Sequence, residues 1–179
     1  MWISRNTMPA LLVAAVALAC GGGDGTGPGD GGDVQAGRFT AQLSGGLSQT
    51  LSGQAFYFQG QAEEGFTVSM SSDAQGSSGT GVVMARGNPA LPEVGAYAVI
   101  DGTTDPLPPD DFFAASFVKS SGSLIECFSD NGGTLTITAS GASLVGDFTV
   151  KAQCLNPGTG QLDPTTITGK FNAVAGSSQ

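Results

Sequence analysis

The chain has 179 residues, a net charge of −9 at neutral pH and no histidine. The lack of histidine excludes a serine–histidine–aspartate relay and a histidine metal site. It also removes the side chain most often used for proton transfer near pH 7. The negative charge opposes binding to nucleic acid, because no cluster of the 6 Lys and Arg residues reverses the sign locally. The composition therefore predicts no conventional hydrolytic site, no cofactor and no nucleic-acid partner.

The N-terminal segment, residues 1–19, has the pattern of a secretory signal. Arg5 is its one cation, and an apolar run over 9–19 follows. At about eleven residues this run is too short for a permanent membrane helix, which needs about 20. The run ends in Val-Ala-Leu-Ala at 16–19, before Cys20, and so resembles the lipobox of bacterial lipoproteins. The resemblance implies that Cys20 is lipidated and becomes the new N-terminus, with an ordinary signal peptide and an incidental cysteine as the alternative.

Residues 20–36 are predicted to be a lipidated cysteine followed by a flexible tether. Eight of the 12 positions in 21–32 are glycine, and such a composition buries no apolar surface. A tether of this kind spans roughly 20 Å, enough to hold a small domain clear of lipid headgroups. Gly21 stands where an Asp would mark retention in the inner membrane of some Gram-negative bacteria. The resemblance therefore implies an exported protein that is anchored to the outer membrane through its N-terminal lipid.

Residues 37–176 are predicted to form one all-β domain, followed by a short tail at 177–179. Apolar residues in this stretch recur with period two, which is typical of half-buried strands. The clearest alternations lie at 39–44, 66–71, 134–139, 144–151 and 167–173, and less regular strand candidates lie at 53–59, 80–86, 94–100, 112–119 and 123–128.

Turn residues predict how the strands connect. Asn-Gly-Gly at 131–133 is expected to be a turn between strands near 123–128 and 133–139, and Ser-Gly at 140–141 a turn before a strand at 143–151. These three strands should form a consecutive antiparallel meander. Sequential hairpins predict a single antiparallel β-sandwich or flattened barrel of about 8–10 strands, mostly up-and-down, and leave both architectures open.

Two short motifs carry a resemblance to a protein family. Gly-Asp-Phe at 146–148 and Gly-Lys-Phe at 169–171 each lie in a predicted strand, after the strand at 133–138. This arrangement resembles the C-terminal half of a family of secreted bacterial lipoprotein β domains of unknown function, which carry a Gly-x-Phe strand twice. The resemblance implies the β fold. It implies no catalytic residue, because that family has no assigned activity.

Cys127 and Cys154 are the cysteines that remain once Cys20 is assigned to lipid. In an exported chain an even remainder predicts a disulfide. The predicted meander places both residues at the same end of the sheet. A bond that closes a loop of about 26 residues would contribute roughly 3 kcal/mol in the chain-entropy model. Two free buried thiols are the alternative.

An acidic, proline-rich segment is a candidate calcium loop because its carboxylates could supply oxygen ligands. The candidate ligands are Asp101, Asp105, Asp110 and Asp111. Their spacing matches no defined calcium motif. An exposed acidic loop that keeps a strand end solvated is therefore the favoured interpretation, and no metal site is predicted.

Two other motifs match signatures of serine β-lactamases, Ser-x-x-Lys at 116–119 and Ser-Asp-Asn at 129–131. In those enzymes the first motif opens a helix, so that Ser and Lys share a face. On the strand predicted here, residues three apart point to opposite faces. No Lys-Thr-Gly follows, and no catalytic residue is predicted.

The sequence as a whole predicts a lipid-anchored extracytoplasmic β domain with a structural or interaction role, which is not an enzyme. Its partner would be an unidentified protein. The alternative is a carrier of a small apolar ligand, in which the strands close around a cavity as in lipocalin-like barrels. The 10 phenylalanines at mostly inward positions fill a core as readily as they line a pocket.

Overall fold

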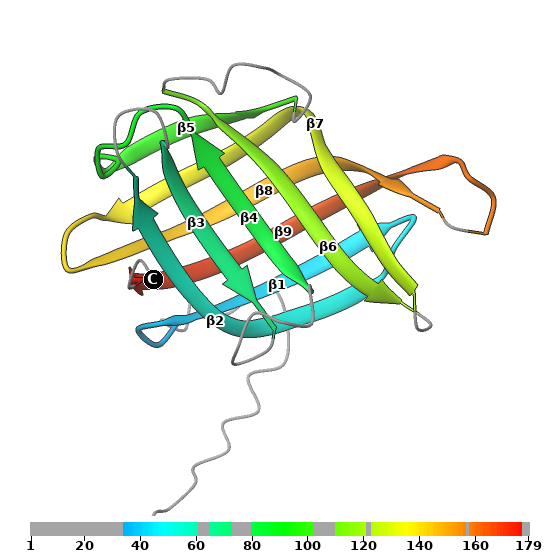
Figure 1. The fold of residues 1–179 in the computed structure, drawn as a ribbon, viewed down its shortest axis with the longest axis horizontal. Helices are drawn as coiled ribbons and strands as arrows, with labels where there is room; N and C mark the ends of the chain where they lie inside the picture. The colour runs from blue at the N-terminus through cyan, green and yellow to red at the C-terminus, as the bar shows by residue number, and fades with distance from the viewer. Residues whose placement is uncertain are drawn as a thin grey trace, which may run out of the picture. The chain divides into compact units, whose positions relative to one another are not determined.

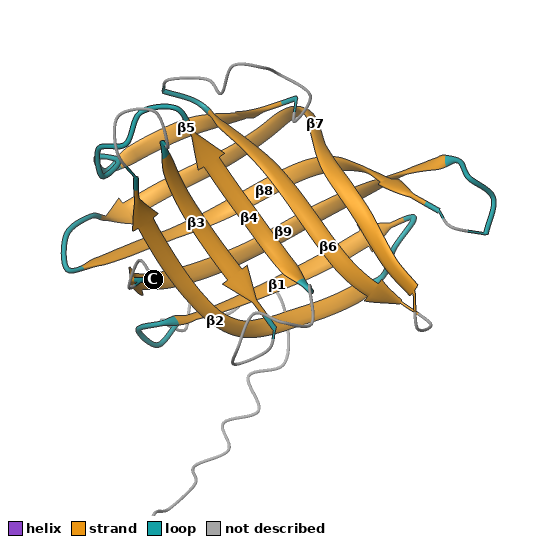
Figure 2. Ribbon diagram, in the orientation of Figure 1, coloured by secondary structure: helices purple, strands orange, loops and turns teal. Residues whose placement is uncertain are grey.

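The computed structural model describes residues 34–60, 65–72, 80–101, 110–120, 123–156 and 158–176. The predicted signal at 1–19, Cys20, most of the tether and the tail at 177–179 lie outside the described residues. The described part of the chain forms nine strands and no helix (Figure 2). Accordingly, no described helix is long and apolar enough to span a membrane. The strands are β1 Arg38–Gly45, β2 Gln49–Gln59, β3 Phe66–Ser71, β4 Gly81–Arg86, β5 Gly95–Ile100, β6 Phe112–Ser120, β7 Ser123–Ala139, β8 Ser143–Leu155 and β9 Leu162–Ala175.

The strands close into a barrel in the order β1-β2-β3-β4-β6-β5-β7-β8-β9, and antiparallel pairing of β9 with β1 completes the circle. In Figure 1, β3, β4 and β6 cross in front of β8, β9 and β1. The predicted all-β class is confirmed, and of the two architectures left open the strands form the closed barrel. Two short parallel contacts, β2 with β9 and β5 with β6, interrupt an otherwise antiparallel arrangement.

β5 and β6 share one position in the barrel wall. β5 pairs with the second half of β7, over Gly133–Ile137, and β6 pairs with the first half, over Ser123–Phe128. The two strands meet only where Val99 and Ile100 lie beside Phe112 and Phe113. The nine strands therefore occupy eight positions. The acidic segment that joins β5 to β6 is an insertion into one strand of the wall.

β7 passes through 131–133 without a turn, so the expected division into two strands is wrong. Asp130 lies opposite Lys151 and Thr134 lies opposite Thr149, so four steps along β7 match only two along β8. The extra residues form a β-bulge in which Gly132 has a φ of 111°, a value that favours glycine. The meander therefore consists of β6, β7, β8 and β9.

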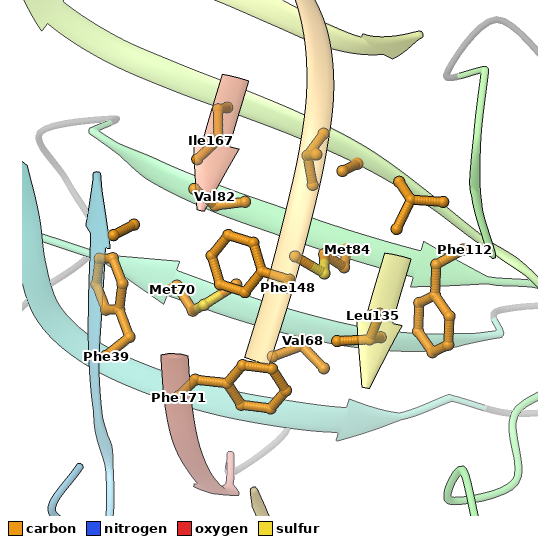
Figure 3. Close-up of a cluster of buried hydrophobic side chains, with 14 of the residues drawn as sticks. Phe39, Val68, Met70, Val82, Met84, Phe112, Leu135, Phe148, Ile167 and Phe171 are labelled. Carbon is orange, nitrogen blue, oxygen red and sulfur yellow. The ribbon is translucent and has the colours of Figure 1, made fainter. Parts of the chain in front are cut away.

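The barrel interior is filled by apolar side chains from every wall. On β8, buried residues alternate with exposed or half-buried ones from Leu144 to Cys154, as the period-two pattern predicts. Figure 3 shows Phe148 of β8 and Phe171 of β9 directed toward Met70 of β3, on the opposite wall. The largest fully buried side chains are Phe39, Phe66, Phe112, Phe171, Leu43, Leu51, Met70, Met84, Leu135, Ile137, Leu144 and Ile167.

The two Gly-x-Phe motifs face each other across β8 and β9. Phe148 lies opposite Gly169, and Gly146 lies opposite Phe171. A Cβ atom at Gly169 would lie 2.5 Å from Cζ of Phe148, which is too close for any carbon. Each ring thus lies over the glycine of the neighbouring strand. The middle residues of the motifs, Asp147 and Lys170, form an exposed cross-strand pair of opposite charge on the outer face.

Gly169→Ala is expected to lower the free energy of unfolding by about 1–3 kcal/mol, because the new methyl group overpacks the core. It would collide with the Phe148 ring and would lie 2.6 Å from the carbonyl oxygen of Thr40, a backbone atom. Urea unfolding followed by circular dichroism measures the change. Gly158→Ala is the matched control, since its Cβ would contact only the side-chain oxygen of Asn156, at 3.3 Å. An unchanged midpoint for Gly169→Ala would contradict the proposed packing.

Candidate functional site

Cys127 of β7 and Cys154 of β8 are directly opposite each other and are joined by a disulfide. Their Cα atoms lie 4.0 Å apart, and both residues point into the barrel interior, where each is 1% exposed. The predicted pairing is therefore confirmed. The bond is consistent with an extracytoplasmic location, where thiols are oxidised. It links the two strands near the end of β8.

Reduction of this disulfide is expected to lower the free energy of unfolding by roughly 3 kcal/mol, since the bond closes a loop between residues separated by 27 positions. Urea unfolding with and without a reducing agent measures the difference. A double variant, Cys127→Ala with Cys154→Ala, is the control and should not respond to the reducing agent. Two freely alkylated thiols in oxidised protein, detected by mass spectrometry, would show that the bond is absent.

The candidate calcium ligands are only partly described. Asp101 follows β5, whereas Asp110 and Asp111 precede β6, and Asp105 lies outside the described residues. Within the described ranges, no three His, Cys, Asp or Glu side chains lie close enough together to hold a metal ion. The structure adds that the segment begins and ends within the barrel wall and joins β5 to β6, which pair with each other only at Val99 and Ile100.

Ser129 fixes the point where the acidic segment leaves the wall. Its side chain is buried, with 3% exposed. The hydroxyl donates to the carbonyl oxygen of Ile100, at 2.6 Å, and accepts from the amide of Ala114, at 3.0 Å. These bonds join β7 to the end of β5 and to the start of β6. The Ser-Asp-Asn motif therefore has a structural role at its serine, and Ser116 and Lys119 of the other motif lie on a strand, β6.

Arg86 occupies an aromatic box that sequence analysis missed. The side chain is 4% exposed, and its Cζ lies 5.8, 5.6 and 5.5 Å from the ring centroids of Phe66, Tyr97 and Phe112. Contact with the three ring faces offsets part of the cost of burying the charge. Nη2 donates to the carbonyl oxygen of Ala90, at 2.7 Å, whereas Nε is buried without a partner. The sequence does contain a signal for this burial: Arg86 lies two and four residues after apolar positions 84 and 82, so on a strand it faces the interior with them.

The segment 87–94 covers the box and is held by side chains around it. Besides the bond from Arg86, Tyr97 donates its hydroxyl to the carbonyl oxygen of Glu93, at 2.8 Å, and Ser140 donates to that of Pro92. Arg86 lies opposite Phe66, which lies opposite Gln59 at the end of β2. The box therefore lies at the barrel end where β1 begins and β9 finishes, which we call the terminal end.

Exposed apolar side chains gather at the other end, which we call the hairpin end because β6–β7 and β8–β9 turn there (Figure 1). Leu155 and Leu162 are the last cross-strand pair of β8 and β9, and they are 46% and 60% exposed. Phe128 and Leu124 on β7 are 42% and 50% exposed. These four residues, Leu124, Phe128, Leu155 and Leu162, are the outer apolar patch.

A cavity of about 220 Å³ opens beside this patch, between residues of β1, β7, β8 and β9. Asp130, Lys151, Gln153 and Thr165 are among the residues that line it. Gln153 donates Nε2 to Oδ2 of Asp130, at 3.2 Å, and the hydroxyl of Thr165 is buried without a hydrogen-bond partner. The β7 bulge follows Asp130 directly, in keeping with the frequent use of bulges to shape sites on sheets. The cavity offers hydrogen-bonding groups next to apolar surface.

No protein-family model, curated protein or solved structure matches this chain. The resemblance to lipoprotein β domains therefore stays a prediction. Three features of the described residues bear on function: the outer apolar patch with its cavity, the aromatic box and the acidic insertion.

Proposed function

We propose that this protein is an exported, lipid-anchored β-barrel that serves as a non-catalytic interaction module on the bacterial cell envelope. The observation that carries the proposal is the contrast between a filled interior and an apolar outer patch. Phe39, Phe66, Phe112 and Phe171 are at most 1% exposed, whereas Phe128 on the outer face is 42% exposed. An exposed aromatic side chain on the outer face of a well-packed barrel suits recognition of another molecule.

The anchor in this proposal is Cys20. The sequence before it resembles a lipobox, and the disulfide between Cys127 and Cys154 suits an oxidising compartment. The described chain begins β1 at the terminal end. In this proposal the tether joins the barrel at the terminal end, whereas the outer apolar patch lies at the hairpin end.

Cys20→Ser is expected to move the protein out of the lipid-anchored membrane fraction, because the thiol that carries the acyl chains is lost. Fractionation of cells, together with labelling by a palmitate analogue, measures the change. Cys127→Ala with Cys154→Ala is the control, since it removes the other thiols and should keep the label. Failure of the unmodified chain to take up the palmitate analogue would overturn the lipid anchor.

The alternative, a carrier of a small apolar ligand, meets two obstacles in the described residues. Side chains from opposite walls fill the interior, and 87–94 is fastened across the terminal end through the carbonyl oxygens of Ala90, Pro92 and Glu93. A carrier needs a pocket of several hundred Å³ with a mouth. Both the core and the cover would have to move before such a ligand could enter.

An apolar fluorescent probe, 1-N-phenylnaphthylamine, is therefore expected to show no saturable uptake by the mature chain from residue 20 carrying Cys20→Ser. Titration followed by fluorescence measures uptake. A variant with a cavity, Phe171→Ala, is the positive control, because loss of a fully buried ring leaves space in the core. Stoichiometric uptake by the chain without that cavity would favour the carrier and overturn the interaction role.

A further inference from the structure

We propose that the outer apolar patch binds an extended segment of a partner polypeptide in which basic and apolar residues alternate on one face. This inference rests on the proposed interaction role and deepens it by naming the chemistry of the partner. It is carried by the register of β7, β8 and β9, by the charges beside the patch and by the rigid support beneath it.

The register brings three of the four side chains of the patch, Phe128, Leu155 and Leu162, close together. Phe128 lies opposite Gln153, so Leu155 is its diagonal neighbour on β8, within reach of a ring. Leu162 lies directly opposite Leu155. Leu155 is therefore the centre of the patch. Leu124 completes it on the same outward face of β7, because residues at even positions from 124 to 130 are exposed while those at odd positions are buried.

Carboxylates flank the ring of Phe128 on its own strand. Glu126 and Asp130 are both exposed and share its outward face, each two residues away. A partner in extended conformation also repeats its side chains every two residues on one face. A segment of the pattern basic-x-apolar-x-basic would place its cations near the two carboxylates and its apolar side chain over Phe128. The net charge of −9 favours the approach of a cationic segment.

The disulfide makes this face rigid. Cys127 precedes Phe128 and Cys154 precedes Leu155, so the bond ties β7 to β8 directly beneath the patch. A surface that is already ordered loses little conformational entropy on binding. The adjoining cavity is lined by Gln153, whose amide donates to Asp130, and by Lys151, which lies opposite Asp130. The second N–H of the Gln153 amide can pair with a backbone carbonyl group of an extended segment.

The size and charge of the patch disfavour two other occupants. The four side chains expose roughly 400 Å², if each offers about 200 Å² when fully exposed, whereas a stable dimer needs about 800 Å² on each partner. In a symmetric contact, Glu126 and Asp130 of two copies would also face each other. An anionic lipid surface would be repelled by the same carboxylates.

The test uses a synthetic peptide, acetyl-Lys-Ser-Leu-Ser-Lys-Ser-Leu-amide, and the isotope-labelled mature chain from residue 20 carrying Cys20→Ser. Chemical-shift changes are expected at the amides around Phe128 and Leu155, and they should weaken as salt rises. Phe128→Ser with Leu155→Ser is expected to weaken binding at least about tenfold. Glu126→Gln with Asp130→Asn should weaken it and remove the salt dependence. Val94→Ser is the matched control, since Val94 is 64% exposed but lies outside the patch.

Three outcomes would overturn the inference: equal binding of the analogue with Glu in place of Lys, shift changes that map elsewhere on the barrel, or no binding at millimolar peptide. Binding of phosphatidylcholine vesicles that requires Phe128, or dimerisation that requires it, would overturn the polypeptide partner in favour of those occupants. Failure of the wider interaction role has a different signature, because a carrier would show shift changes at inward residues such as Val68 and Leu135 on addition of the apolar probe.

Discussion

The fixed width of a closed eight-position barrel is the constraint on which the rest of this structure depends. Inward side chains from all walls must share that space, and two of the large rings lie over positions where a neighbouring strand carries no side chain. These rings are Phe148, over Gly169, and Phe171, beside Gly146. Side chains of β8 and β9 fill the core from one wall, and side chains of β3 and β4 fill it from the other. The exposed apolar side chains lie on the outer face of the barrel.

The barrel wall departs from regular pairing where β5, β6 and the β7 bulge meet. Ser129 lies where the end of β5 and the start of β6 meet β7, just before the bulge. Its hydroxyl accepts from the amide of Ala114 and donates to the carbonyl oxygen of Ile100, so both backbone groups have a partner where the strand pairing is interrupted. Burying either group without a partner would cost about 1–3 kcal/mol. One serine thus pairs backbone groups on both sides of the acidic insertion, and Asp130, which lines the cavity, directly precedes the bulge.

Sequence patterns predicted the strands well because alternation of apolar and polar residues reports directly on a two-sided wall. They predicted the disulfide because only one pair of cysteines remained. They were wrong at 131–133, because Asn-Gly-Gly suits a bulge as well as a turn, and only pairing with β8 distinguishes the two. The box around Arg86 and the patch around Leu155 were not predicted, because both depend on contacts between residues far apart in the sequence. Arg86 contacts the rings of Tyr97 and Phe112, and Leu155 lies beside Phe128 and Leu162.

The two barrel ends differ in a way that follows from these contacts. At the terminal end, side chains of Arg86, Tyr97 and Ser140 donate to carbonyl groups of 87–94, so these backbone groups are paired within the barrel. At the hairpin end, β8 finishes and β9 begins with a leucine pair that no described strand covers, and the disulfide ties β8 to β7 beneath this pair. The two ends therefore differ in chemistry: carbonyl groups of 87–94 are paired at the terminal end, and apolar side chains are exposed at the hairpin end.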